Sequence, residues 1–176
     1  MTPPQPSPTS PSPFVLDHAG LVPPGGTVLD LACGGGRHGR WFLERGHEVV
    51  FVDRDISPLL DVMDGPEAEV LELDLETPAG WPLGGWRFDA IVVVNYLWRP
   101  ILPAIIAAVA PGGVLLYDTF AQGNEAYGRP SNPDFLLKPD ELKDAVAGRL
   151  TLRDFRQGYV ETPKPAIRQS IAAIRE

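Results

Sequence analysis

The segment VLDLACGGGRHG, residues 28–39, decides how the chain folds. Its first four residues favour a buried strand, and an amphipathic helix follows from Arg37. The glycines between them allow positive φ and let ligand atoms approach the backbone closely. Gly34, Gly36 and Gly39 also satisfy the pattern G-x-G-x-x-G. The segment therefore predicts a strand–turn–helix unit whose turn binds a ligand, and a glycine turn without a ligand is the alternative.

Strand and helix patterns alternate on both sides of this segment. We expect strands over residues 27–31, 48–53, 68–74, 88–95 and 114–118, helices over 14–21, 37–45, 57–63, 100–109 and 139–147, and two β segments over 150–159 and 167–174. The continuous apolar runs in the strands are typical of parallel strands covered by helices on both faces. The alternation predicts an α/β fold, a doubly wound Rossmann-like, mostly parallel sheet with a C-terminal antiparallel hairpin.

Length and composition exclude several classes of protein. The chain has 176 residues, the size of one domain, and 44% of them are hydrophobic. With 15 basic against 23 acidic residues the net charge is −8, which disfavours binding to nucleic acid. One cysteine and three scattered histidines exclude a disulfide framework and a zinc site, and we expect no bound metal.

The N-terminus differs in composition from the rest. Residues 2–13 contain six prolines and five Ser or Thr residues, so we expect residues 1–13 to be a disordered tail and residues 14–176 the folded domain. A docking ligand for a proline-recognising domain is the alternative. No apolar stretch reaches the ~20 residues of a membrane span, and the first basic residue is Arg37, so we expect neither a membrane segment nor a secretory signal and a cytoplasmic protein.

Three acidic residues narrow the ligand of the glycine turn. Asp53 ends the second strand 17 residues after Gly36, where its carboxylate can accept both hydroxyls of a ribose. Asp30 precedes the turn and would repel the pyrophosphate of a dinucleotide but attract an ammonium group. Asp74 ends the third strand and can accept a hydrogen bond from an adenine amine. An adenosine ligand other than a dinucleotide is favoured.

At this point a resemblance to a known family is evident. The segments VLDLACGGGRH, VVFVDRDISPLL, LELDLE, FDAIVVVNYLWRP and APGGVLLYDTF resemble the successive motifs of class I S-adenosylmethionine-dependent methyltransferases. The resemblance covers residues 27–118. Within the family, the chain is similar to small bacterial single-domain members such as the tellurite-resistance-type group. The family turn reads acid-x-Gly-x-Gly-x-Gly, and this chain has Ala32 in place of the first glycine.

The resemblance implies S-adenosylmethionine as cofactor and a role for each matching position. Asp30 would face the methionine amino group, and Asp53 would bind the ribose. The backbone of residues 32–36 would line the methionine moiety. The remaining implied contacts are Ala32, Gly34 and Gly36 in the turn, Arg54 beside the adenine, Asp74 and Leu75 at the adenine edge, and Asn95 beside the sulfonium. From its position at the helix start we add Arg37 as a partner of the methionine carboxylate, with a solvated helix-terminal arginine as the alternative.

The chemistry that the resemblance implies needs few catalytic groups. A methyl sulfonium is already electrophilic, so the enzyme mainly aligns a nucleophile, and a base is needed only for an acceptor protonated at neutral pH. Asn95 and Tyr96 are the candidate catalytic residues, and His38 is a weaker one. Tyr96 and Trp98 are predicted either as substrate walls or as part of the core. Cys33 is interpreted as a small residue that fills space in the turn.

The long connection 119–137 is the candidate substrate lid. Loops beyond ~12–15 residues are usually functional or disordered. Tyr127 and Arg129 are predicted to close over a polar or anionic acceptor, and the alternative is a surface loop tethered by residues 135–137.

The sequence thus predicts a monomeric or homodimeric methyltransferase that acts on a small-molecule acceptor by in-line displacement. A non-catalytic S-adenosylmethionine-binding partner subunit and an NAD(P)-dependent oxidoreductase are the alternatives.

Overall fold

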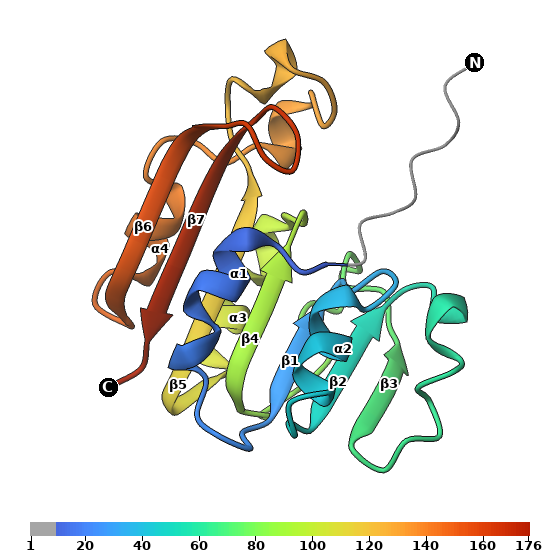
Figure 1. Ribbon diagram of the computed structural model, residues 1–176. Coiled ribbons are helices and arrows are strands. Elements are labelled where there is room, and N and C mark those ends of the chain that lie inside the picture. The colour runs from blue at the N-terminus through green and yellow to red at the C-terminus, as the bar shows by residue number, and fades with distance from the viewer. Residues whose placement is uncertain (1–9) are drawn as a thin grey trace, which may run out of the picture.

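A single seven-stranded sheet organises the chain in a computed structural model that describes residues 10–176 (Figure 1). The strand order is β3-β2-β1-β4-β5-β7-β6. The first five strands in sequence are parallel, and β7 pairs antiparallel with both β5 and β6. The predicted doubly wound sheet with a C-terminal antiparallel hairpin is confirmed.

The elements follow the predicted alternation. The strands are β1 (Val28–Leu31), β2 (Val49–Asp53), β3 (Ala68–Glu72), β4 (Phe88–Val94), β5 (Val109–Phe120), β6 (Thr151–Val160) and β7 (Ala166–Ile174). The α-helices are α1 (Pro13–His18), α2 (Arg37–Leu43), α3 (Leu102–Ala107) and α4 (Glu141–Val146), and short 3-10 turns connect several of these elements.

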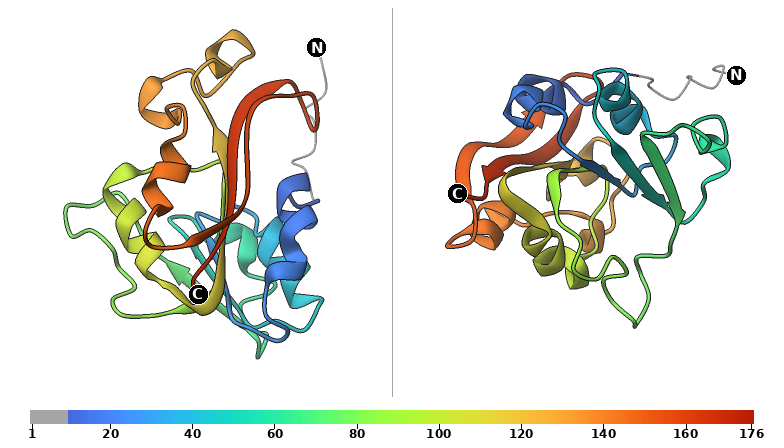
Figure 2. Two further views of the ribbon diagram at one scale, coloured as in Figure 1. Left: turned by 90° about the vertical axis from the view of Figure 1, so that its left-hand side faces the viewer. Right: turned by 90° about the horizontal axis from the view of Figure 1, so that it is seen from below.

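The sheet is the middle layer of three, with α1 and α2 on one face and α3 and α4 on the other (Figure 2). Strand β4 shows why both faces are covered. Its side chains alternate between two apolar cores, with Ile91 and Val93 on the α3–α4 side and Ala90 and Val92 on the α1–α2 side. The all-apolar run that the sequence shows there is the consequence of burial on both faces.

The strand order reverses between β1 and β4, which places a crevice at the carboxyl ends of these strands. From β1 the chain proceeds outward to β2 and β3, and then it returns to β4 on the other side of β1. In open α/β sheets, ligands bind at such a switch point because the loops diverge there. The glycine turn follows β1, so it lies at this crevice.

Two elements differ from the prediction. Residues 57–63 form only a 3-10 turn, Ser57–Leu59, in place of a helix. Strand β5 begins at Val109, five residues before the predicted strand, because a bulge opposite Phe88 and Ala90 lets Pro111 and Gly112 stay within it. Neither difference alters the crevice.

The start of the folded domain differs as well. The predicted tail, residues 1–13, includes Pro11 and Ser12, and both are buried. The Ser12 hydroxyl caps α1 by accepting from the Val15 N–H at 3.3 Å. The domain therefore begins before Phe14, because a capping residue belongs to its helix, while residues 1–9 of the predicted tail lie outside the described residues. Within residues 10–176 we find no helix with the length and apolar character needed to cross a membrane.

Candidate active site

The glycine turn is shaped by three residues with left-handed backbone. Ala32, Gly34 and Gly36 have φ of 51°, 54° and 77°. The turn is held against β2 by a hydrogen bond from the Cys33 N–H to the Val52 carbonyl, at 3.0 Å. A Cβ at Gly36 would lie 2.7 Å from a Leu59 methyl group, so glycine is required there. Ala32 adopts a conformation that favours glycine, at a local cost of about 1 kcal/mol.

A cavity of about 620 Å³ lies directly above this turn, and we call it the loop cavity. Its lining comes from the carboxyl ends of β1 and β4 and from the first turn of α2, and comprises Asp30, Ala32, Cys33, Gly34, Gly35, Arg37, His38, Arg40, Val94 and Asn95. Five of the predicted cofactor and catalytic positions, Asp30, Ala32, Gly34, Arg37 and Asn95, are thus brought together.

Asp30 is the buried acid of the loop cavity. Its side chain is almost sealed, at 2% exposure, and one oxygen accepts the Gly39 N–H at 2.8 Å. Burial raises the pKa of Asp30 from 3.8 to about 7, although the Gly39 hydrogen bond and the nearby Arg37 oppose the rise. Its other oxygen has no hydrogen-bond partner among residues 10–176. A cation entering the cavity would therefore meet a carboxyl oxygen to which no described group donates a hydrogen bond.

Asp53 lies at the end of β2 and contacts the glycine turn. Its carboxylate is held by two backbone donors, the Gly34 N–H at 2.8 Å and the Asp55 N–H at 3.0 Å. Each oxygen keeps a further lone pair for a hydroxyl group. The structure places Arg54 next to it and leaves Arg54 exposed.

The predicted adenine-edge residues follow β3, the neighbour of β2. Asp74 is exposed, and its Oδ1 accepts the Glu76 N–H at 2.8 Å in a tight local turn, while Leu75 is buried in the core. Because β2 and β3 are parallel neighbours, Asp53 and Asp74 end on the same edge of the sheet. Their binding roles remain predictions.

His38 and Cys33 are poor candidates for acid–base chemistry. The Nε2 atom of His38 accepts the Ser12 N–H at 3.0 Å, and burial, followed by the charge of Arg37, lowers the pKa of His38 to about 3. The ring is therefore neutral and its acceptor nitrogen is occupied. Burial, followed by the charge of Asp30, raises the pKa of the Cys33 thiol well above its usual range, so this cysteine stays protonated.

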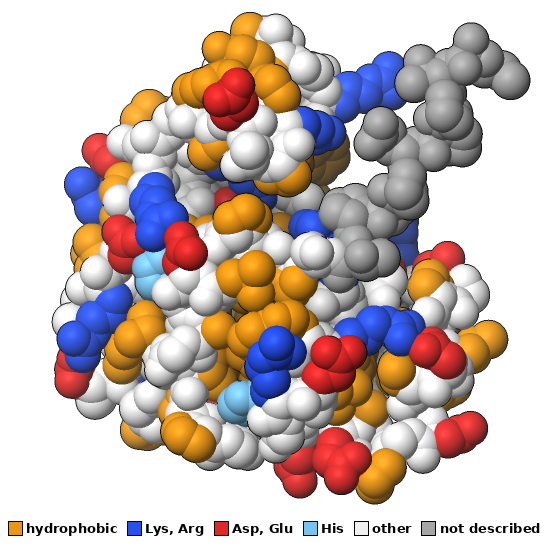
Figure 3. Space-filling model, viewed as in Figure 1, with side chains coloured by type: hydrophobic (Ala, Val, Ile, Leu, Met, Phe, Trp, Pro, Cys, Tyr) orange, Lys and Arg blue, Asp and Glu red, His pale blue; other side chains and the backbone are white. Residues whose placement is uncertain are grey.

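A second cavity of about 340 Å³ adjoins the first, and we call it the hairpin cavity. The two share Arg37 and Asn95. The rest of its lining comes from the start of α1, the end of β5 and the β6–β7 hairpin: Ser12, Pro13, Phe14, Asp118, Arg156, Gln157, Gly158, Tyr159, Val160, Thr162, Pro163, Arg168 and Ser170. In the space-filling view the surface is hollowed above α1 (Figure 3).

The polar floor of the hairpin cavity was not predicted from the sequence. Asp118 on β5 accepts three side-chain hydrogen bonds, from the hydroxyls of Ser12 and Ser170, both at 2.7 Å, and from Nε of Arg168 at 2.9 Å. Nη2 of Arg168 donates in turn to Oδ1 of Asn95 at 2.7 Å. A chain of hydrogen bonds therefore runs from the domain's first residues to the boundary of the loop cavity.

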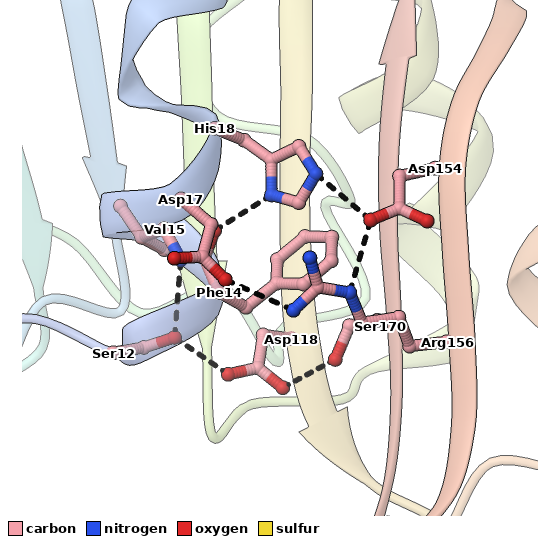
Figure 4. A network of polar contacts seen from close by, with 9 residues as sticks. All are labelled: Ser12, Phe14, Val15, Asp17, His18, Asp118, Asp154, Arg156 and Ser170. Carbon is pink, nitrogen blue, oxygen red and sulfur yellow. Dashed lines mark hydrogen bonds and ion pairs between the residues drawn. The ribbon is translucent and has the colours of Figure 1, made fainter.

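Helix α1 is held over the sheet by further ionic contacts to β6 (Figure 4). Arg156 pairs with Asp17 at 3.0 Å and with Asp154 at 2.9 Å, and His18 contacts the same Asp154 at 2.9 Å. The guanidinium of Arg156 also lies 5.1 Å from the Phe14 ring. These contacts fix the wall that α1 provides to the hairpin cavity.

Neither cavity, as the described residues form it, is lined by the predicted residues Tyr96, Trp98, Tyr127 and Arg129, and the same holds for the predicted cofactor residues Gly36, Asp53, Arg54, Asp74 and Leu75. Trp98 packs partly buried against the core below α3. The Tyr96 hydroxyl points away, 3.5 Å from Glu76, and burial followed by the Glu76 charge raises the pKa of Tyr96. Tyr127 and Arg129 are exposed, and the Tyr127 ring lies 5.4 Å from that of Tyr159, which borders the hairpin cavity.

The long connection 119–137 is anchored at several points. Leu136 and Leu137 are buried, and the Arg99 guanidinium donates to the Leu136 carbonyl at 2.9 Å. The Asn124 amide donates to the Pro130 carbonyl at 3.0 Å. Residues 125–129 and 131–135 of this connection are exposed, and its role as a lid stays a prediction.

The described residues carry no single large basic field on the face that Figure 3 shows. On the face shown in Figure 3, basic side chains are scattered among acidic ones. In the part of the chain that the structure describes, no three His, Cys, Asp or Glu residues are arranged to hold a metal ion.

Comparisons with known proteins agree with this geometry. No family model matches the chain. A malonyl-[acyl-carrier protein] O-methyltransferase of Salmonella typhimurium is 34% identical over 104 residues, which cover 56% of this chain and 40% of that protein. The chain thus spans less than half the length of this relative.

Solved structures share the fold over nearly the whole chain. TehB from Haemophilus influenzae has a TM-score of 0.74 at 20% identity, with 94% of this chain and 63% of that chain covered. The 1,6-didemethyltoxoflavin-N1-methyltransferase of Burkholderia thailandensis, solved with bound 1,6-didemethyltoxoflavin and S-adenosylhomocysteine, has a TM-score of 0.68 at 20% identity, with 92% of this chain and 76% of that chain covered. Its strand order and these similarities show that the chain has the fold of the class I S-adenosylmethionine-dependent methyltransferases.

Proposed function

We propose that this chain transfers a methyl group from S-adenosylmethionine to a small-molecule acceptor by in-line displacement. The observation that carries the proposal is the junction of the two cavities at Arg37 and Asn95. A donor in the loop cavity and an acceptor in the hairpin cavity would meet at this junction. The two methyltransferases named above support the reaction type.

The loop cavity suits S-adenosylmethionine better than a dinucleotide. The free oxygen of Asp30 is available to the ammonium group of a methionine moiety, whereas the same carboxylate would repel a pyrophosphate. A Cβ at Gly34 or Gly35 would meet no described atom within 4 Å, so the turn leaves open space beside its backbone. Asp53 retains lone pairs for the two ribose hydroxyls.

The residues at the junction bind and orient, and they do not take a proton. When bound, S-adenosylmethionine supplies an electrophilic methyl sulfonium. Near-attack alignment then provides most of the rate, and Asn95 is held for it by Arg168. Neither His38, with its acceptor nitrogen occupied, nor Asp118, with three donors, is free to act as a base. We therefore expect an acceptor whose nucleophilic atom is unprotonated at neutral pH or loses its proton to water.

Parallel calorimetric titrations test the cofactor. We expect S-adenosylmethionine and S-adenosylhomocysteine to bind and NADH not to bind. Asp53→Ala should weaken binding about 10- to 100-fold, because each charge-assisted hydrogen bond contributes about 1.5–3 kcal/mol. Asp64→Ala, at an exposed position in the β2–β3 connection, is the matched control. Binding of NADH in place of the sulfur compounds would exclude a methyltransferase.

The hairpin cavity separates an enzyme from a non-catalytic cofactor-binding subunit. A subunit that only binds the cofactor needs no acceptor site, whereas this chain builds a polar, walled cavity next to the donor. The test is to measure the formation of S-adenosylhomocysteine with each of a panel of candidate acceptors. The variant Ser170→Leu narrows the hairpin cavity, and its loss of turnover would show that the activity depends on this cavity.

A further inference from the structure

One arginine on the floor of the hairpin cavity is fixed in orientation. Arg168, on β7, donates from Nε to Oδ1 of Asp118 at 2.9 Å, and from Nη2 to Asn95 at 2.7 Å and to the Asp118 carbonyl at 3.0 Å. Its side chain is only 12% exposed, and it lies over the Phe120 ring at 4.5 Å. The guanidinium is therefore held before any ligand arrives.

The third nitrogen of this guanidinium is left for a ligand. The bonds above use the N–H of Nε and both N–H groups of Nη2, so the two N–H groups of Nη1 remain. Nη1 has no partner among residues 10–176. No fully buried side-chain nitrogen or oxygen in this part of the chain lacks a partner, so Nη1 opens to the cavity that Arg168 lines.

The charges around the cavity favour an anion. Arg37, Arg156 and Arg168 line it, against the single carboxylate of Asp118. Arg156 is compensated by its pairs with Asp17 and Asp154, which lie outside the lining. Arg37 donates only to a neutral group, the Ser10 carbonyl at 3.0 Å. The lining therefore carries a positive charge that its own carboxylate does not neutralise.

The remaining walls favour an organic body over an inorganic ion. Phe14, Val160 and Pro163 line the cavity together with Pro13 and the ring of Tyr159. A volume of about 340 Å³ is at the small end of the range for ligand pockets, ~300–1,000 Å³. Apolar walls over an arginine suit a compact carbon skeleton that bears one anionic group.

We propose that the methyl acceptor is a small organic acid and that Arg168, held by Asp118, binds its carboxylate. This inference rests on the proposed function, since it assigns the hairpin cavity to the acceptor. It replaces the exposed Arg129, which the sequence suggested for an anionic acceptor, with an arginine from a different segment. An oxygen of a carboxylate can accept one of the remaining N–H groups of Arg168 in a charge-assisted hydrogen bond.

Formate, the smallest carboxylate, is a probe that fits the hairpin cavity. The protein is saturated with S-adenosylhomocysteine and its melting temperature is followed with sodium formate at constant ionic strength, with chloride as the compensating ion. We expect a saturable rise, because a ligand that binds only the native state stabilises it by mass action. Formamide, the neutral isostere, should produce no rise.

Variants assign the effect to Arg168. Arg168→Gln should raise the formate midpoint by about 10- to 100-fold, the loss expected for one charge-assisted bond, and Arg168→Lys should raise it less. Arg153→Gln, at an exposed position on β6, is the control and should leave the midpoint unchanged. Binding of S-adenosylhomocysteine by every variant confirms that each is folded.

Several outcomes would overturn the assignment. A response to formate no larger than to formamide would exclude a carboxylate site. Tighter binding of inorganic phosphate than of formate would indicate an oxyanion acceptor. Loss of the response in Arg129→Gln but not in Arg168→Gln would move the anion to the long connection. Failure of the wild-type protein to bind S-adenosylhomocysteine would instead contradict the proposed function. The failure of the carboxylate site and the failure of the proposed function are therefore distinguishable.

Discussion

Asp30→Asn should make the empty protein more stable and the cofactor bind more weakly. Asp30 is 2% exposed, and its pKa rises from 3.8 to about 7 on folding. The native state therefore holds this proton more tightly than the unfolded state, so the associated stability is complete below about pH 4 and is lost as the pH rises to about 7. Ionised Asp30 then lowers the free energy of unfolding by about 4 kcal/mol, because of the linkage between pKa and stability. Asparagine has the same shape and never ionises.

Urea unfolding of wild type and Asp30→Asn at pH 5 and pH 8, without cofactor, measures this cost. The free energy of unfolding of the variant, relative to wild type, should increase by about 3 kcal/mol between the two pH values, because most of the titration falls in this window. Asp64→Asn is the control for an exposed carboxylate. A difference that stays the same at pH 5 and pH 8 would show that folding does not bury the Asp30 charge, and would refute the reasoning.

Titration with S-adenosylhomocysteine gives the second half of the prediction. The ammonium group is expected to pair with ionised Asp30 only, so wild-type affinity should fall about fivefold from pH 7 to pH 6. Asp30→Asn should bind more weakly at pH 8 and lose this pH dependence. Equal affinities at pH 8 would place the ammonium group elsewhere.

Three further predictions concern packing, the domain start and metals. Gly39→Ala should lower stability by about 1–3 kcal/mol, because its Cβ would overlap the Phe51 ring, whereas Gly35→Ala meets no described atom within 4 Å and should be nearly neutral; urea unfolding compares them. Ser12→Ala should lower the free energy of unfolding by about 1–2 kcal/mol, because it removes the cap of α1 and a donor to Asp118. Ser10→Ala, at an exposed position, is its control in the same assay. Treatment with EDTA should leave the melting temperature unchanged, and a drop reversed by one divalent ion would contradict this.

The fold was predictable because its determinants are local. Two-sided apolar strands, the glycine turn and the acids at strand ends each lie within a dozen residues, and the order of the elements leaves few topologies. The helix expected at residues 57–63 failed because Pro58 and the exposed Asp61, which pairs with Arg40 on α2, hold a turn instead. That contact between distant segments is invisible in a local pattern.

The acceptor side of the site was not predictable in the same way. Asp118 and Arg168 are 50 residues apart, and they meet only because β5 and β7 pair antiparallel with Asp118 opposite Ser170. One signal was present in the sequence. The run Arg168-Gln169-Ser170 interrupts an otherwise apolar strand, and polar residues in an interior strand of a sheet usually have a partner. Ser12 was missed because a proline-rich composition hides a helix cap.

Ser12 has a consequence for communication between the two cavities. Its N–H is bound to His38 on α2, which borders the loop cavity, and its hydroxyl is bound to Asp118 on the floor of the hairpin cavity. One residue thus contacts the lining of both cavities, and a ligand that orders it in one cavity lowers the entropic cost of ordering it in the other. Donor and acceptor should therefore bind with positive cooperativity, and linkage requires the same factor in each direction.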